Sequence, residues 1–253
     1  MSHPAAPAKP EAEAFQPDVW ERTKGFGAPV QAMNRRLFMQ LLVLDCDPAL
    51  GAATTIGALA DSLAERRVPG VIYEDVNNPF AIGLLTFGED PSHFVDNVRP
   101  CFSSGPAARA RIKPEFTMLG RTYATGYESD LEFWLLNRPV ETVLNENWKW
   151  AVWYPLRRSG AFARLEPREQ GSILREHGDI GKAYGEQDLA HDVRLACHGI
   201  DANDNEFVIG LIGKELHPLS HVMQTMRRTR QTAEFIVQMG PFFVGRAVRQ
   251  LRG

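Results

Sequence analysis

A histidine followed by glycine, His177 in the stretch GSILREHGDIG (171–181), has the side chain best suited to chemistry in this part of the chain. The apolar spacing before it predicts an amphipathic helix over 166–178, which places His177 in the last turn. An imidazolium there offsets the negative end of the helix dipole, and Gly178 supplies a left-handed residue that ends the helix. A neutral imidazole nitrogen is also able to ligate a transition metal. Local sequence favours the capping interpretation and leaves the ligand interpretation open.

Two groups of arginines supply positive charge near the ends of predicted elements. Arg157 and Arg158 follow the expected strand 148–156, and the stretch RRTR (227–230) ends an expected helix. Arginine at a helix C-terminus interacts favourably with the dipole and is usually solvated, whereas a guanidinium can also bind a carboxylate through two hydrogen bonds. Tyr154, in the alternating stretch WAVWYPLRR, is expected near a domain edge, where tyrosine packs its ring and keeps its hydroxyl in water.

These residues lie in the second of two similar halves of the chain. The segment that begins at Asn78 can be aligned with the segment that begins at Asn205. The matched pairs are Phe80 with Phe207, Ile82 with Ile209, Gly83 with Gly210, Leu84 with Leu211, His93 with His221 and Arg99 with Arg227. A repeat of about half the chain indicates a duplicated domain and not a solenoid, whose periods are much shorter.

Each half contains the same order of predicted elements, which is strand, helix, strand, strand, helix, strand. In the first half these are strands 35–45, 68–76, 80–88 and 115–126 and helices 49–66 and 90–100. In the second half they are strands 148–156, 192–200, 206–213 and 241–248 and helices 166–178 and 216–229. The βαββαβ order is that of a ferredoxin-like domain, with helices on one face of an antiparallel sheet. The expected fold class is therefore α+β, with duplicated ferredoxin-like domains whose other sheet faces cover each other.

The domain organisation follows from this order: an N-terminal arm over 1–33, expected to be flexible, a first domain over 34–126, a linker over 127–147 and a second domain over 148–253. Hydrophobic residues make up 44%, charged residues 23%, and the net charge is −3, which is typical of a globular protein and not of a nucleic-acid-binding surface. No stretch has the length of a membrane span or the apolar core of a secretory signal, so a cytoplasmic location is expected. The three cysteines are far apart and predict buried thiols, not a disulfide framework or a zinc site.

Four segments of the second half occur in the order and nearly the spacing found in one family. They are WYPLRR at 153–158, REHGDIGKAY at 175–184, HGIDANDNEFVIGL at 198–211 and MRRTRQTAEFIVQMGPFFVG at 226–245. Together they resemble the chlorite dismutase family, most closely its branch of coproheme decarboxylases, which form heme. The first half matches mainly by its order of elements, and the duplicated ferredoxin-like plan is the fold of this family.

The resemblance implies that His177 ligates the iron of heme b or of iron coproporphyrin (coproheme), because the matching histidine has that role in the family. A hydrogen-bonding partner on the other imidazole nitrogen tunes the electron density at the metal. Gln231 aligns with a carboxylate that holds this histidine in chlorite dismutases, so it is a candidate for that partner. The alternative is a glutamine on the surface of a helix.

Tyr154 aligns with the tyrosine that coproheme decarboxylases oxidise, with hydrogen peroxide as oxidant, to a radical that acts on a propionate before carbon dioxide leaves. A phenol suits this task because it can lose a proton and an electron together. Arg157 and Arg158 supply cations for the substrate carboxylate, and Arg158 stands where the family usually has lysine. Arg227 and Thr232 match positions that contact propionates, although the recurrence of Arg227 in the first half also suits a structural role.

The strand after the predicted helix departs from the family's pattern. Chlorite dismutases place an arginine on it and many decarboxylases a glutamine or histidine, but this chain has the longer stretch DLAHDVRLACHG. Counting from the helix puts Ala190 at that position, and counting back from Gly199 puts Asp192 there. Arg194, two residues beyond Asp192, lies on the same strand face and can still reach the pocket. Chlorite dismutation is therefore disfavoured, and an aspartate beside a ferric heme requires pairing with Arg194.

The resemblance therefore implies a heme-dependent oxidoreductase that converts coproheme to heme b with peroxide, with the porphyrin and hydrogen peroxide as partners and without nucleic acid or membrane. One alternative is another heme peroxidase or a chlorite-degrading member of the family, in which loss of Arg194 abolishes turnover. Another is a heme-binding or heme-transfer protein without catalysis, in which Tyr154→Phe changes no measurable property. A third alternative is a protein of the same fold that has lost its cofactor. The family's usual assembly is a ring of five, which implies a homo-oligomer.

Overall fold

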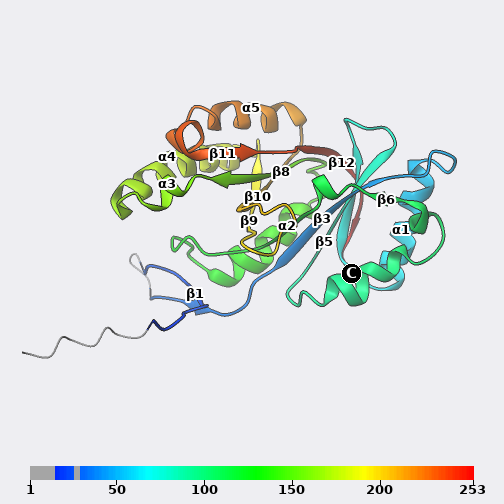
Figure 1. Cartoon of the computed structure of the whole chain (residues 1–253), viewed down its shortest axis with the longest axis horizontal. Coiled ribbons are helices and arrows are strands. Elements are labelled where there is room, and N and C mark those ends of the chain that lie inside the picture. Colours follow the sequence, from blue (N-terminus) through cyan, green and yellow to red (C-terminus); the bar gives the residue numbers. More distant parts are fainter. Residues whose placement is uncertain (1–14, 26–28) are drawn as a thin grey trace, which may run out of the picture.

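Antiparallel strands from both halves of the chain form the framework of the fold (Figure 1), and the computed structural model describes residues 15–25 and 29–253. Residues 1–14 and 26–28 of the expected arm lie outside the described part. The strands of the first half are β3 (Phe38–Asp45), β4 (Gly70–Asp75), β5 (Ala81–Gly88) and β7 (Met118–Arg121). Those of the second half are β8 (Trp150–Arg158), β9 (His191–Ala196), β10 (Phe207–Gly213), β11 (Ile236–Met239) and β12 (Phe243–Leu251).

Both halves have the same strand arrangement. The sheet order is β7-β3-β5-β4 in the first half and β12-β8-β10-β9 in the second, so the fourth strand lies beside the first, followed by the third and the second. In addition, β9 pairs with β7 and β12 pairs with β4, which joins the two sheets edge to edge into a closed ring of strands. The predicted duplicated ferredoxin-like plan is confirmed, and each sheet covers the inner face of the other.

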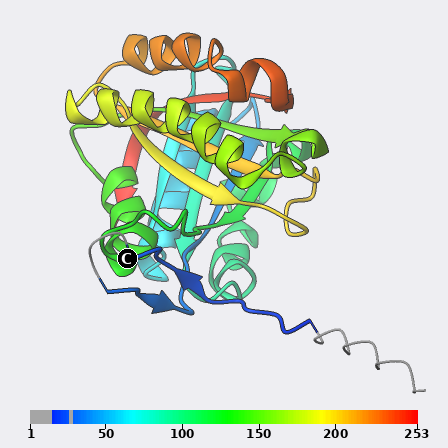
Figure 2. The same ribbon diagram turned by 90° about the vertical axis from the view of Figure 1, so that its left-hand side faces the viewer.

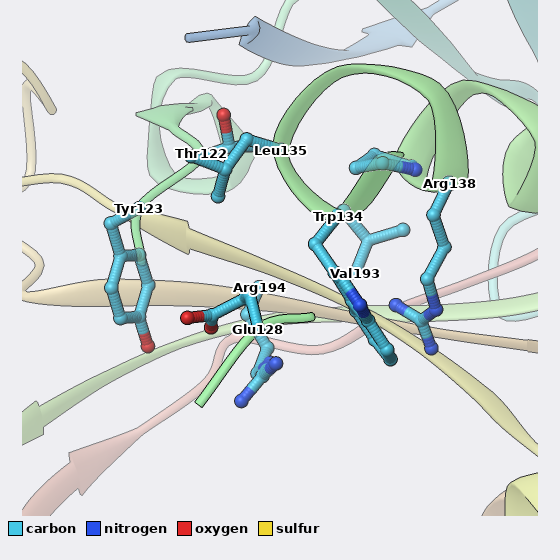
Figure 3. A pocket seen from close by; sticks show the side chains of 9 residues that line it. Thr122, Tyr123, Glu128, Trp134, Leu135, Arg138, Val193 and Arg194 are labelled. Atoms are coloured by element: carbon cyan, nitrogen blue, oxygen red, sulfur yellow. The ribbon is translucent and has the colours of Figure 1, made fainter. Parts of the chain in front are cut away.

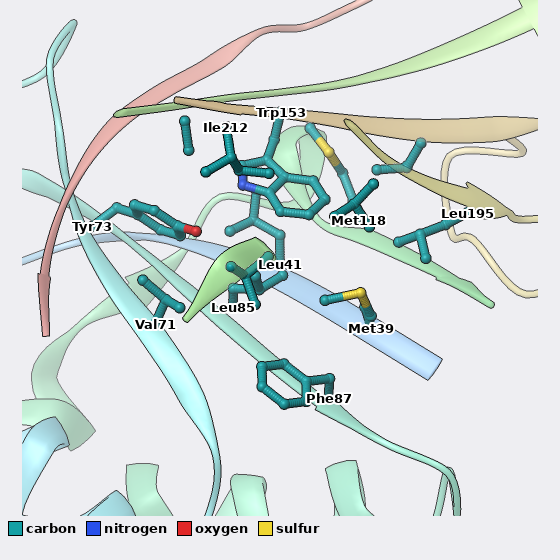
Figure 4. Packing of buried hydrophobic residues seen from close by; sticks show 14 of the residues in the cluster. Met39, Leu41, Val71, Tyr73, Leu85, Phe87, Met118, Trp153, Leu195 and Ile212 are labelled. Atoms are coloured by element: carbon teal, nitrogen blue, oxygen red, sulfur yellow. The ribbon is translucent and has the colours of Figure 1, made fainter. Parts of the chain in front are cut away.

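The inside of the ring is filled by apolar side chains from both halves (Figure 4). Trp153 is fully buried, and a Cβ atom added to Gly210 of the neighbouring strand would lie 2.6 Å from its indole ring. In the repeat, Gly83 takes the place of Gly210, and there an added Cβ would lie 2.5 Å from the ring of Phe243. The two matched glycines therefore have the same function, which is to leave room for an aromatic ring in the shared core.

We expect Gly210→Ala to destabilise the protein by about 1–3 kcal/mol, because the added methyl group overpacks the core against Trp153. Gly171→Ala is the control, since Gly171 lies in a helix with no heavy atom within 4 Å of an added Cβ. This second change should stabilise the protein by up to about 1 kcal/mol, as alanine is the better helix former. Urea unfolding measures both values, and equal effects of the two variants would contradict the packing argument.

Helices cover the outer faces of the two sheets. On the first half, α1 (Ala52–Glu65) packs on β4 and β5, and on the second half α4 (Pro167–Glu186) packs on β9 while α5 (Leu216–Met226) packs on β8 and β10. Figure 2 shows α4 and α5 side by side over the second sheet. Among the described residues, no helix is both long and apolar enough to cross a membrane.

The largest difference from the sequence prediction concerns α4. The helix does not end at His177 but continues to Glu186, and Gly178 has ordinary helical backbone angles. Ile173 before the glycine and Ile180 and Tyr184 after it lie on one side of this helix, and all three pack in apolar clusters. The capping interpretation of His177 is therefore wrong, because the residue lies in the middle of the helix, where the last-turn carbonyls are out of reach.

Other segments also differ from their predicted form. In place of a regular helix over 90–100 the chain has a π-helical turn, η1 (Phe94–Val98), followed by a 3₁₀ turn, η2 (Arg99–Phe102). The expected linker contains η5 (Phe133–Asn137) and α2 (Arg138–Val143). Shorter elements are β1 (Glu21–Arg22), β2 (Ala32–Met33), η3 (Pro106–Arg109), β6 (Arg111–Ile112), η4 (Pro114–Phe116), α3 (Gly160–Ala163) and η6 (Gln231–Phe235). The prediction of buried thiols is confirmed for all three cysteines.

Candidate functional site

The sheet face beneath α4 and α5 carries the polar residues selected from the sequence. In the registers of the second sheet, Ile209 of β10 lies opposite Tyr154 of β8 on one side and opposite Arg194 of β9 on the other. Leu211, two residues on, lies opposite Asp192. Because side chains alternate along a strand, Tyr154, Arg194 and Asp192 all project from this outer face.

His177 is half-buried, and the hydrogen bonds around it determine which ring nitrogen carries the proton. Its Nδ1 lies 3.4 Å from Oγ1 of Thr229, a long hydrogen bond. Thr229 donates its own hydroxyl proton to the carbonyl oxygen of Met226 at 2.8 Å, so it accepts from His177. Nε2 then keeps its lone pair. Burial, followed by the positive charge of Arg194, lowers the pKa of His177, which favours the neutral imidazole that a metal requires.

Gln231 is buried and not on the surface of a helix, so the surface alternative is wrong. It begins η6, which packs on α4, and its Oε1 has no hydrogen-bond partner among the described residues. A buried acceptor without a donor costs free energy. In this conformation the nearest partner of His177 is Thr229, which the sequence reasoning missed.

Asp192 is held between two arginines. Its Oδ1 accepts a hydrogen bond from Nη2 of Arg138 at 2.9 Å, its carbonyl oxygen accepts one from Nη1 of Arg138 at 2.8 Å, and its Oδ2 lies 3.0 Å from Nε of Arg194. Burial acts to raise the pKa of Asp192, but the charges of Arg194 and Arg138 outweigh it and lower the pKa. The aspartate is therefore ionised and has the pairing with Arg194 that its position requires. Ala190, the other residue reached by counting, is buried against the helices.

Tyr154 is almost fully buried, and its ring stacks on Phe242 with 4.9 Å between the centroids. Burial, and after it the negative charge of Asp192, raises the pKa of the phenol, while the charge of Arg227 opposes the shift. The side chain therefore stays protonated at neutral pH and has both a proton and an electron to give.

The other residues selected from the sequence differ in whether their side chains already have a partner in the protein. Arg157 lies on the opposite sheet face from Tyr154, and its guanidinium donates to the carbonyl oxygens of residues 203 and 204, so the structure does not bring it to the site. Arg158 shares the face of Tyr154, but Glu206 binds it at 2.8 Å. Arg227 ends α5, and within the described chain its side chain forms no ion pair. Thr232 contacts Thr229 at 3.3 Å through the two hydroxyls.

Residues from the linker also reach this face, which the sequence reasoning did not foresee. A cavity of about 20 Å³ lies where the linker meets β9 (Figure 3), enough for about one water molecule. Its lining residues are Thr122, Tyr123, Glu128, Trp134, Leu135, Arg138, Pro139, Val193 and Arg194. The ring of Trp134 packs under the Arg138 guanidinium, 4.9 Å from its centroid. Because the linker has no repeat partner and no local motif, nothing in the sequence indicated that Arg138 reaches Asp192.

The first half has the same backbone positions, but two of the three polar residues have apolar equivalents there. If Ile82 is matched with Ile209 and Leu84 with Leu211, the strand registers define the equivalent residues on the neighbouring strands. The equivalent pairs are Tyr154 with Leu44, Asp192 with Ile72 and Arg194 with Glu74. Both Leu44 and Ile72 are fully buried in an apolar cluster beneath α1. Polar residues at the positions of Tyr154 and Asp192 are therefore not required by the fold, whereas the position of Arg194 is charged in both halves.

In a comparison with protein families, the chlorite dismutase model matches residues 107–248. The chain belongs to the chlorite dismutase family. No curated protein matches the sequence significantly. The matched segment covers the linker, α4 with His177 and the strands of the second half as far as residue 248 of β12, as expected if the family features are concentrated there.

Solved structures show the same fold for this chlorite dismutase family member at low sequence identity. A protein from Thermus thermophilus, described as a novel heme-binding protein, is 16% identical with a TM-score of 0.69, over 85% of this chain and 92% of that one. A variant chlorite dismutase from Candidatus Nitrospira defluvii, solved with cyanide, is 11% identical with a TM-score of 0.66, over 86% of this chain and 92% of that one. At this identity the similarity establishes the fold.

Proposed function

We propose that this protein binds an iron porphyrin through His177 and uses hydrogen peroxide to decarboxylate coproheme to heme b. The observation that carries the proposal is the polar face under α4 and α5, where Tyr154 and Asp192 have the buried apolar equivalents Leu44 and Ile72 in the other half of the duplicated fold. Family membership and the heme-binding description of the similar Thermus thermophilus protein support the choice of cofactor.

The residues present fit a porphyrin. His177 offers a neutral ring whose Nε2 carries no proton and can ligate iron. Gln231 begins η6, which packs on the same helix as His177, and its unpartnered Oε1 is a second hydrogen-bond acceptor near this site, besides Thr229. A tetracarboxylate needs cations. Arg227 is unpaired within the described residues, and Arg158, whose Nε and Nη2 donate to Glu206, keeps its Nη1 for a propionate, while the hydroxyl of Thr232 adds a donor. Arg157 is left out of this assignment because it lies on the other sheet face. A cavity of about 20 Å³ is far below the several hundred Å³ of an organic ligand site, so the pocket in Figure 3 is assigned to water.

The bound iron porphyrin supplies the redox chemistry with peroxide. The contribution of the chain is to present Tyr154 as a protonated phenol that can give up its proton and an electron, and to hold the propionates against it. Arg194 is held by Asp192, which makes it less available to a chlorite anion and favours decarboxylation over chlorite degradation. A homo-oligomeric assembly and a cytoplasmic location stay predictions.

We expect coproheme to bind the wild-type protein with a shift of its optical spectrum, and His177→Ala to weaken this binding by at least about 100-fold. Loss of a group that only hydrogen-bonds to a metal ligand already lowers metal affinity by about 10–100-fold, so loss of the ligand itself should cost at least as much. His198→Ala is the control, since His198 is exposed and its ring packs on Phe207. Optical titration with coproheme and heme b in parallel measures the affinities. Equal binding by His177→Ala, or no binding of either porphyrin to the wild type, would contradict the proposal.

A further inference from the structure

A second histidine site lies on the outer surface of the helical layer. His217 and His221 are one turn apart on α5, both are exposed, and their ring centroids are 6.1 Å apart. Residues four apart on a helix project from the same side. Two imidazoles at this spacing are the arrangement by which a single helix holds a zinc ion in the HExxH motif.

Hydrogen bonds around His221 leave one ring nitrogen for a metal ion. The hydroxyl of Tyr184, on α4, is hydrogen-bonded to Nδ1 of His221 and lies 3.2 Å from the hydroxyl of Thr225. Thr225 itself donates to the carbonyl oxygen of His221 at 3.0 Å. Nε2 has no hydrogen bond within the described part of the chain, so it is the nitrogen left for a ligand. A metal ion on Nε2 leaves the ring proton on Nδ1, which then donates to the tyrosine oxygen.

We propose that His217 and His221 bind one divalent transition metal ion of the zinc, nickel or copper class, with water completing the coordination. Imidazole suits these ions, and a donor bond from the second ring nitrogen is the usual support of a ligating histidine. With zinc–nitrogen bonds of about 2.0–2.1 Å, ring centroids lie roughly 3 Å from the ion, so two rings on a tetrahedral ion are about 5 Å apart. The observed separation is about 1 Å larger, which a small rotation of the exposed His217 side chain closes.

The site also joins the two helices that cover the polar sheet face. Tyr184 belongs to α4, which carries His177, and both metal ligands belong to α5, so the hydrogen bond between Tyr184 and His221 connects the site to α4. No group of three or more histidine, cysteine, aspartate or glutamate side chains placed for a metal ion is found in the described residues. The proposed site therefore depends on two protein ligands, and loss of either one removes chelation.

Zinc titration of the chelator-treated, full-length protein by isothermal calorimetry tests the proposal. We expect one zinc ion per chain for the wild type and for His198→Ala, and an affinity at least about 10-fold lower for His217→Ala and for His221→Ala, by analogy with the effect of weakened metal ligation. Tyr184→Phe leaves both ligands in place but removes the oxygen that accepts from Nδ1 of His221 once the ion is on Nε2, so it should weaken binding severalfold.

Two results would overturn the proposal. Absence of zinc binding to the wild-type protein would exclude the site, and wild-type affinity in both His217→Ala and His221→Ala would place the ion elsewhere. Unchanged affinity in Tyr184→Phe would refute the role given to the tyrosine. Far-ultraviolet circular dichroism of each variant shows whether α5 is folded, and because both ligands are exposed, folded variants are expected.

Discussion

Tyr154→Phe is expected to bind coproheme as tightly as the wild-type protein and to lose peroxide-dependent decarboxylation by roughly 100-fold or more, in line with the usual contribution of about 10²–10⁴ from a positioned proton-transfer group. The substitution keeps the ring that stacks on Phe242 and removes only the hydroxyl. A phenyl ring has no acidic proton, so proton and electron can no longer leave together. Chromatographic separation of coproheme, the partly decarboxylated product and heme b measures the rate.

Tyr73→Phe is the matched control for this experiment. Tyr73 is as deeply buried as Tyr154, and burial raises the pKa of both phenols, but Tyr73 lies inside the ring of strands, on the other side of the sheet from the polar face. Full activity in Tyr154→Phe would exclude the radical role. If the wild-type protein binds coproheme but never converts it, the chain is a heme-binding protein without this activity.

The duplicated fold could be predicted from the sequence because its main determinants repeat. Gly83 and Gly210 match in the alignment and each makes room for an aromatic ring in the same core. The alternation of side chains along a strand also predicted correctly that Asp192 and Arg194 share a face. Both inferences depend on local periodicity, which the sequence shows directly.

The end of α4 could have been predicted but was not. The sequence His177-Gly178 matches a common helix C-terminus, and two further glycines follow before Glu186. However, Ile173, Ile180 and Tyr184 keep to one helix face at spacings of seven and four residues. Tertiary packing of that face outweighs the cost of glycine in a helix, about 1 kcal/mol per residue. The apolar periodicity therefore predicts the end of α4 better than the local capping signal does.

The contact between Arg138 and Asp192 could not have been predicted from local patterns. The two residues are 54 positions apart, and the contact depends on how the linker folds back across β9. Glu128 likewise reaches the cavity beside Arg194 from the linker. Long-range ion pairs of this kind have no sequence period, so a single sequence does not indicate them.

This network gives the second prediction, for Asp192→Ala. The substitution leaves the guanidinium groups of Arg138 and Arg194 close together without the carboxylate between them. Breaking a fully buried pair costs about 3–5 kcal/mol, but the side chains of Asp192 and Arg194 are 36% and 41% exposed, so solvent screening reduces the expected loss to about 2 kcal/mol. Urea unfolding measures it. Glu234→Ala, which removes an exposed partner of Arg230, is the control and should cost under about 1 kcal/mol.

The double variant Arg138→Leu, Asp192→Ala separates pairing from burial. If the loss in Asp192→Ala comes from an unopposed guanidinium, removing Arg138 as well restores part of the stability, and the two changes are not additive.

The pH dependence of the stability has a defined sign, because the pKa of Asp192 is lowered from 3.8 in the folded chain. Its carboxylate therefore stabilises the fold above that value and loses this effect as pH falls through the lower, folded pKa. The stability difference between wild type and Asp192→Asn should then shrink below about pH 4, and a difference that persists in acid would show that packing, not charge, holds Asp192 in place.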